Sequence, residues 1–130
     1  MFKGSKGAGV SLTKGVRTTV RVKKSAKNSV KIKINGKPTS AGVSKSVADA
    51  FLSLVGAECQ LVVEHEIDVP IRCGLGTSGA GALSLALALN EALGLKLSRI
   101  EAAQIAHVAE VKHKTGLGTV IDETFGGIEI

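Results

Sequence analysis

Residues 70–82 read Pro-Ile-Arg-Cys-Gly-Leu-Gly-Thr-Ser-Gly-Ala-Gly-Ala, and they join a strand-like segment to the start of an apolar, helix-like segment. Glycines let a backbone approach a ligand closely and present successive N–H groups to it. The first turn of a helix adds unpaired amides and the positive end of the helix dipole, which favour an anion such as phosphate. Thr77 and Ser78 place hydroxyls where a phosphate-bound Mg²⁺ would take oxygen ligands. The stretch therefore predicts a phosphate-binding loop with a magnesium ion beside it.

Other glycine-rich loops fit this stretch less well. Gly74, Gly76 and Gly79 match the GxGxxG pattern of dinucleotide-binding folds. Those folds need a strand after the helix, whereas a second helical segment follows here. A Walker A loop is excluded, because no Gly-Lys-Ser/Thr follows the glycines. A glycine-rich turn with a purely structural role in front of a core helix stays open.

The segments around the loop show strand and helix patterns. Period-two alternation of apolar and polar residues predicts three strands, at 16–23, 30–34 and 60–68. We expect the first two strands to belong to an antiparallel sheet with one dry and one basic face. Helix patterns cover 47–55, 78–93 and 98–112, and a further strand begins at 128. The order of elements predicts an α+β domain.

Local signals mark the ends of the expected helices. Ser44 or Ser46 can cap the first helix, and Gly94 ends the second. Ser98 and Glu101 have the spacing of a capping box, which predicts the start of the third helix.

Composition and charge limit the class of protein. The chain has 130 residues, one domain's worth, and 44% are apolar. Its first 48 residues contain ten Lys and two Arg and no acid, which indicates either an anionic partner or a solvated basic face. The longest apolar stretch, 80–93, is shorter than the ~20 residues that span a membrane. Cys59 and Cys73 lack the spacing of a metal site. We therefore expect both to be free thiols in a cytoplasmic protein.

The glycine-rich stretch resembles the second motif of the GHMP kinases, Pro-x-x-x-Gly-Leu-Gly-Ser-Ser-Ala-Ala. Thr77 replaces the first Ser and Gly79 replaces the first Ala. Further segments are similar to segments of the archaeal pantoate kinase branch, so the resemblance covers nearly the whole chain: 4–10, 80–83, 86–89, 106–111 and 115–118. It implies the N-terminal domain of a GHMP kinase, which is like the second domain of ribosomal protein S5. That fold is a mostly antiparallel sheet packed with helices.

The resemblance also implies an activity and a set of site residues. GHMP kinases of this branch transfer a phosphoryl group from ATP to pantoate, giving 4-phosphopantoate for coenzyme A synthesis in archaea. By matching position, the residues that would hold the ATP phosphates are Gly74, Leu75, Gly76, Thr77, Ser78, Gly79 and Ala80. Ser78 and Glu110 would hold Mg²⁺. An ion pair of Glu110 with Lys114 at i,i+4 is an alternative role for that carboxylate.

The chain departs from the family pattern in three places. The first GHMP motif is missing before Gly4, and the C-terminal domain with the third motif is missing after residue 130. We therefore expect residues 1–130 to be one partial ATP-binding domain that is inactive alone. Thr119 stands where many members carry the Asp that is a candidate general base. Asp122, one helical turn later, is the alternative candidate, and a reaction without a base stays open.

The histidines and partners complete the expectations. We expect His65 to be a hydrogen-bonded interior residue and His113 to favour the C-terminal end of its helix. His107 lies three residues before Glu110, either as a structural residue or as a metal ligand. The partners implied are ATP and a small hydroxy acid, without a membrane, and the sequence does not indicate an oligomeric state.

Two other functions stay open. The chain can belong to a GHMP kinase of homoserine or mevalonate type, or it can be a non-catalytic basic domain that binds nucleic acid. Single-strand binding usually needs aromatic side chains on which bases stack. No aromatic residue is interleaved with the lysines here, so we do not expect nucleic acid as a partner.

Overall fold

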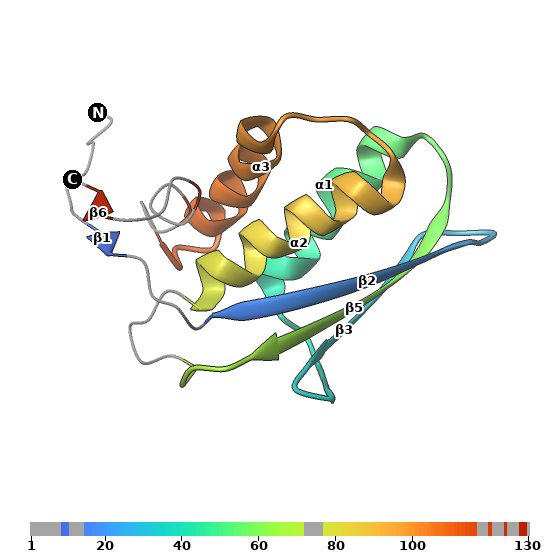
Figure 1. The fold of residues 1–130 in the computed structure, drawn as a ribbon. Coiled ribbons are helices and arrows are strands. Elements are labelled where there is room, and N and C mark those ends of the chain that lie inside the picture. The colour runs from blue at the N-terminus through green and yellow to red at the C-terminus, as the bar shows by residue number, and fades with distance from the viewer. Residues whose placement is uncertain are drawn as a thin grey trace.

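A four-stranded sheet carries three helices on one face (Figure 1). In the computed structural model, residues 9–10, 15–71, 77–116, 120, 124 and 128–129 are described. The strand order is β2 (Val16–Lys24), β5 (Cys59–Ile67), β3 (Ser29–Ile34) and β4 (Lys37–Thr39). The helices are α1 (Gly42–Val55), α2 (Thr77–Leu93) and α3 (Arg99–Lys112). A separate antiparallel pair joins β1 (Gly9–Val10) to β6 (Ile128–Glu129).

The predicted strands form, but the first two are not neighbours. β5 lies between β2 and β3, antiparallel to β2 and parallel to β3. Of the strands in this sheet, β5 has the most buried inner face, and its Leu61 and Val63 are fully buried. A central position in the sheet removes the largest apolar area of β5 from water. Residues 25–28 reach across it because two strand spacings amount to only about 10 Å. The sheet is therefore mixed, and two of its three strand pairings are antiparallel.

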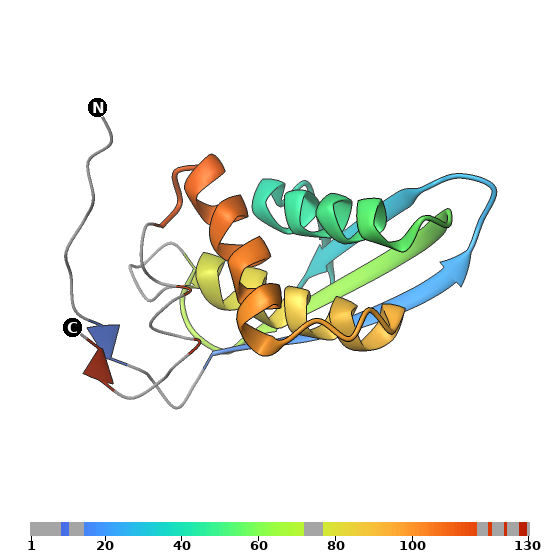
Figure 2. The same ribbon diagram turned by 90° about the horizontal axis from the view of Figure 1, so that it is seen from above.

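The core lies between the sheet and the helices. Seen from above, α1 and α2 lie side by side on the sheet, and α3 packs against α2 (Figure 2). The largest fully buried apolar side chains are Phe51, Leu61, Leu85, Leu89, Val47, Val63 and Val120. The buried face of α3 is built from alanines and Glu110, which lets the two helix backbones approach closely. Small residues on α3 therefore fix the position of α3 against α2.

Helix ends confirm some sequence signals and correct one. The capping box is present: the Ser98 hydroxyl accepts from the Glu101 N–H, and the Glu101 carboxylate accepts from the Ser98 N–H. Gly94 follows α2 in the left-handed region, with φ 63°. The prediction for α1 is wrong, because that helix begins at Gly42 and Ala41 is its N-cap without a side-chain bond. Ser44 is a buried residue within the helix, and its hydroxyl is hydrogen-bonded to the His65 imidazole.

The described helices are also too short or too polar to traverse a lipid bilayer.

Candidate functional site

The N-terminus of α2 and the C-terminal turn of α3 meet at one hydrogen bond. Ser78, in the first turn of α2, donates its hydroxyl proton to Oε1 of Glu110 at 2.5 Å. Glu110 is in the last turn of α3, and only 1% of its surface is exposed. The two residues are 32 positions apart in the sequence. The structure thus brings together the hydroxyl and the carboxylate for which the family resemblance implied a shared magnesium ion.

Thr115 is a third member of this cluster that the sequence did not reveal. Its hydroxyl donates to the same Glu110 Oε1 at 2.9 Å and lies 3.3 Å from the Glu110 carbonyl oxygen. The chain returns toward Glu110 because Lys114 adopts a left-handed conformation, with φ 56°. This turn also lets the Thr115 N–H donate to the Glu110 carbonyl at 3.1 Å. A threonine just after a helix end is a weak signal, since the left-handed turn that aims it is not visible in the sequence.

The described residues bind the Glu110 carboxylate through one of its two oxygens. Both hydroxyls bind Oε1, and among the described residues no donor reaches Oε2. Buried polar atoms normally have a partner, because leaving one without costs free energy. An oxygen-only set of carboxylate and hydroxyls is the set that Mg²⁺ prefers, and Mg²⁺ commonly uses one or two carboxylates together with phosphate oxygens. The residues present therefore fit a magnesium ion that is shared with a phosphate ligand.

Alternative roles for the neighbouring charged residues do not match the structure. Within the described ranges, the ion pairs are Arg17–Glu66 and Lys45–Asp49, so Lys114 does not pair with Glu110. Nor do these ranges contain a cluster of three or more His, Cys, Asp and Glu that could hold a metal by itself. His113 lies at the C-cap of α3, and its Nε2 is 2.7 Å from the Ser46 hydroxyl. His113 therefore connects α3 to α1 and lies outside the cluster at Glu110.

His65 supports α2 from below, as a hydrogen-bonded interior residue, which confirms the prediction. Its Nδ1 lies 2.8 Å from the Thr18 hydroxyl and its Nε2 lies 3.0 Å from the Ser44 hydroxyl. Thr18 in turn contacts the Ser84 hydroxyl of α2 at 2.5 Å. Burial lowers the pKa of His65, so the imidazole is neutral at pH 7. These bonds attach the first half of α2 to the sheet and to α1.

The remaining predicted site residues are only partly described. Thr77, Ser78, Gly79 and Ala80 form the first turn of α2, whose N–H groups have no partner within the helix. Residues 74–76, predicted to hold phosphate, lie outside the described residues. So do Asp122, the candidate general base, and Thr119, which stands at the position of the family's Asp. Cys73 lies outside them as well, whereas Cys59 is buried with a free thiol.

Residues 43–127 match the family described as the GHMP kinases N terminal domain. The chain belongs to the GHMP kinase family. The matched region contains α1, β5, α2 and α3 apart from the first residue of α1, and so it contains Ser78, Glu110 and Thr115. The predicted α+β fold of a GHMP N-terminal domain is thereby confirmed.

Two relatives and one solved structure place the chain within the GHMP kinases. It is 39% identical over 133 residues to the pantoate kinase of Thermococcus kodakarensis, covering 98% of this chain and 43% of that protein. It is 35% identical to the pantoate kinase of Methanospirillum hungatei, covering 99% and 44%. A solved "phosphotransferase related to CoA biosynthesis pathway" superimposes with a TM-score of 0.87 at 38% identity, covering 96% and 43%. The chain thus spans less than half the length of these relatives.

Proposed function

We propose that this GHMP kinase chain supplies the ATP- and magnesium-binding part of an enzyme that phosphorylates the hydroxyl of pantoate. The observation that carries the proposal is the contact of Ser78 with the buried Glu110 at the start of α2. It places a helix N-terminus, a hydroxyl and a carboxylate together, which is the set of groups that a nucleotide phosphate and its cation need. Pantoate as the acceptor is supported by the pantoate kinases to which the chain is similar.

The chain's own groups have distinct roles in this proposal. The first-turn amides of α2, with residues 74–76, donate hydrogen bonds to the phosphate oxygens. Glu110 and Ser78 hold the magnesium ion, which neutralises charge on the phosphates when it is bound. Thr115 orients the Glu110 carboxylate, and His65 fixes α2 to the sheet. Phosphoryl transfer depends mostly on positioning and charge stabilisation, so these residues contribute by geometry. Asp122 is the candidate base, Thr119 stands at the position of the family's Asp, and a reaction without a base is the alternative.

Thermal unfolding with Mg-ATP tests the nucleotide site. A ligand that binds only the folded chain adds stability of about 2.7 kcal/mol at one hundred times its Kd, so Mg-ATP should raise the Tm of the unaltered chain. Ser78→Ala and Glu110→Gln should lose most of that gain. Ser53→Ala removes a comparable hydroxyl from the exposed side of α1 and should keep it. An equal gain in Glu110→Gln and the unaltered chain would contradict the proposed site.

An acceptor comparison tests the substrate separately. The protein is the longest polypeptide that contains this sequence. Its release of ADP from ATP is measured with pantoate, homoserine or mevalonate as the acceptor. Pantoate-dependent release is expected, and it should disappear in Glu110→Gln. Release that depends on homoserine or mevalonate instead would keep the kinase and replace its substrate.

A further inference from the structure

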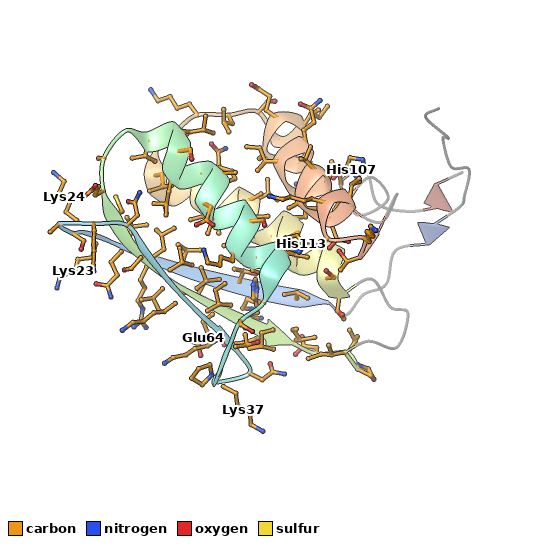
Figure 3. The ribbon with its side chains drawn as sticks, turned by 180° about the vertical axis from the view of Figure 1, so that it is seen from behind. Lys23, Lys24, Lys37, Glu64, His107 and His113 are labelled. Atoms are coloured by element: carbon orange, nitrogen blue, oxygen red, sulfur yellow. The ribbon has the colours of Figure 1, made fainter. Side chains whose placement is uncertain are left out.

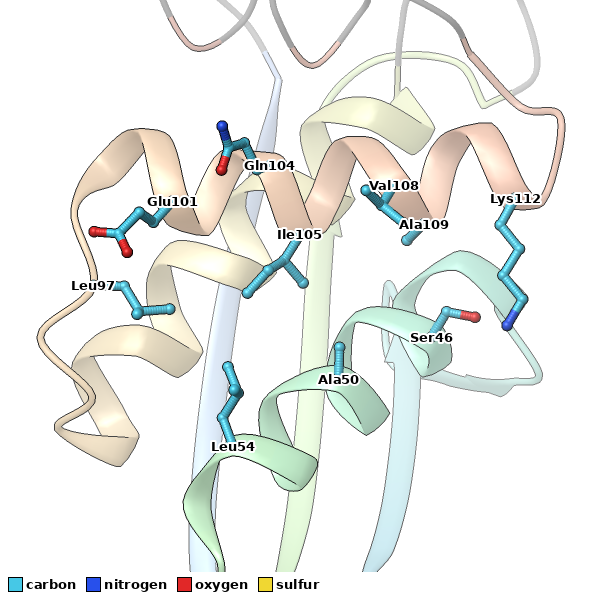
Figure 4. A pocket seen from close by; sticks show the side chains of 10 residues that line it. All are labelled: Ser46, Ala50, Leu54, Leu97, Glu101, Gln104, Ile105, Val108, Ala109 and Lys112. Carbon is cyan, nitrogen blue, oxygen red and sulfur yellow. The ribbon is translucent and has the colours of Figure 1, made fainter.

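A groove on the outer surface of the helices lies away from the Ser78–Glu110 site. It has a volume of about 490 Å³ and runs between α1 and α3 (Figure 4). Its lining residues are Ser46, Ala50, Leu54, Leu97, Glu101, Gln104, Ile105, Val108, Ala109 and Lys112. In Figure 4, Leu54 and Ile105 point toward each other across its middle, while Glu101 and Lys112 stand at opposite ends. The groove is therefore apolar at its centre and oppositely charged at its two ends.

Large apolar side chains are exposed at this groove and beside it. Val108 is 64% exposed and Leu54 is 54% exposed, and Ile100 and Val111 add exposed apolar surface to α3. Single exposed apolar residues are normal, but a contiguous group of them marks a surface that another protein covers. The group here includes residues of α1 and α3 that face the same groove.

The groove face of α3 is complementary to itself when it is reversed. Glu101, Ile105, Val108 and Lys112 follow one another at spacings of four, three and four residues, which places them on one side of a helix. An antiparallel second copy of α3 pairs each Glu101 with the other Lys112 and each Ile105 with the other Val108. The carboxyl of Glu101 is ionised at neutral pH, and hydrogen bonds with Ser98 lower its pKa further below the ordinary value of 4.5. Both ends of such a pair therefore join opposite charges, and its centre joins apolar side chains.

We propose that the α1–α3 groove binds a second copy of this chain through antiparallel pairing of the two α3 helices about a twofold axis. A twofold interface uses the same patch on both subunits, and the reversed order of charge and apolar residues on α3 meets that requirement. Leu54 and Ala50 of α1 flank the paired helices and cover their apolar centre. The proposal does not depend on the activity proposed above, since the groove does not include Ser78 or Glu110.

Sedimentation equilibrium with single charge reversals is the first test. The unaltered chain should associate to a dimer with rising concentration. Lys112→Glu or Glu101→Lys places like charges at both ends of the interface, so each should lower the association constant by about tenfold or more. Lys31→Glu makes the same change of charge on the sheet face opposite the helices and should leave association unchanged.

Mixing the two charge variants is the decisive test. In a heterodimer of Lys112→Glu with Glu101→Lys, both ends again join opposite charges, so association should return when the two are combined. Because Glu101→Lys also removes the capping box, circular dichroism checks its fold. If that variant does not fold, Val108→Asp alone tests the interface instead. Val108 is 64% exposed in the monomer, so the substitution should leave the fold intact, and a charge at the apolar centre should abolish the dimer. A monomer at all concentrations, or a dimer that Lys112→Glu and Val108→Asp leave unchanged, would overturn the proposal and assign the groove to another segment or partner.

Discussion

Glu110 is buried, and two hydroxyls donate hydrogen bonds to the same carboxylate oxygen, Oε1. Ser78 comes from the helix that begins at the glycine-rich stretch, whereas Thr115 comes from the turn that ends the helix of Glu110 itself. The pairing of Ser78 with Glu110 followed from resemblance to a family, because no spacing rule links residues that far apart. Thr115 could not be predicted, since its aim depends on the left-handed conformation of Lys114.

Thr115→Val should weaken magnesium binding with little effect on folding. The substitution keeps the shape of the side chain and removes the proton that orients Glu110 Oε1, so we expect the magnesium concentration needed for half of the ATP-induced Tm gain to rise about threefold to tenfold. Thr115→Ser keeps the hydroxyl and should restore the original value. If valine and serine behave alike, the hydroxyl has no role in orienting the carboxylate.

His65 should make the stability of the fold depend on pH. Burial lowers the pKa of His65 below its ordinary value of 6.5, so the unfolded chain binds a proton more readily than the folded chain. The contribution of neutral His65 is complete above pH 6.5 and is lost as the pH falls through and below that value. The residues that contact its ring nitrogens, Thr18 and Ser44, carry no charge.

Urea unfolding at pH 7.5 and pH 5.5 measures this dependence. The unaltered chain should lose stability between the two pH values, and His65→Gln should lose less, although it starts from a lower stability. Glu101, whose pKa is lowered from 4.5, contributes its own loss only at more acidic pH. Equal losses in the two proteins would show that His65 does not titrate differently in the folded state.

At the scale of elements, α2 is fixed by what lies under its first two turns. Gly81 packs over the ring of His65, and a Cβ at this position would lie 3.8 Å from the His65 Cε1, an ordinary contact. The sequence predicted α2 and α3 well, because their ends carry Gly94 and the Ser98–Glu101 box. The predicted start of α1 was wrong, because the Ser44 hydroxyl is hydrogen-bonded to His65 of β5 and does not cap the helix. The sequence also failed for the neighbour of β2, because the choice of central strand depends on burial across the whole sheet.

Two glycine substitutions, one within α2 and one just after it, should have opposite effects on the stability of the fold. Gly81→Ala should stabilise the fold by about 0.5–1 kcal/mol, because alanine is the better helix former and the new methyl group has room. Gly94→Ala should destabilise it by about 1–2 kcal/mol, because φ is 63° there. Chemical unfolding of both variants measures the difference, and destabilisation by Gly81→Ala would mean that α2 lies closer to His65 than described.

At the scale of the whole molecule, basic residues of β2 and β3 lie on the open face of the sheet. Lys31, Lys33, Arg17 and Arg21 lie on the exposed side of β2 and β3, which confirms the expected basic face. Figure 3 shows Lys23, Lys24 and Lys37 extending outward from the sheet, with Glu64 on the strand between β2 and β3. Glu64 and Glu66 of β5 interrupt the basic surface, and Arg17 pairs with Glu66 at 3.6 Å. The helices that carry Ser78 and Glu110 cover the other face, so the basic residues of β2 and β3 and the candidate site lie on different sides of the sheet.

This separation predicts how the two sides respond to substitution. Replacing Lys31 and Lys33 together by Glu should leave the Mg-ATP gain in Tm unchanged, because both residues face away from α2. The same change should weaken retention on heparin, which reports the density of positive charge alone. If the chain bound nucleic acid, its affinity for nucleic acid would depend steeply on salt and would fall in the double lysine variant. Ser78→Ala would leave that affinity unchanged. Loss of the Mg-ATP response in the double lysine variant would mean that the basic face takes part in nucleotide binding, which the arrangement of sheet and helices does not support.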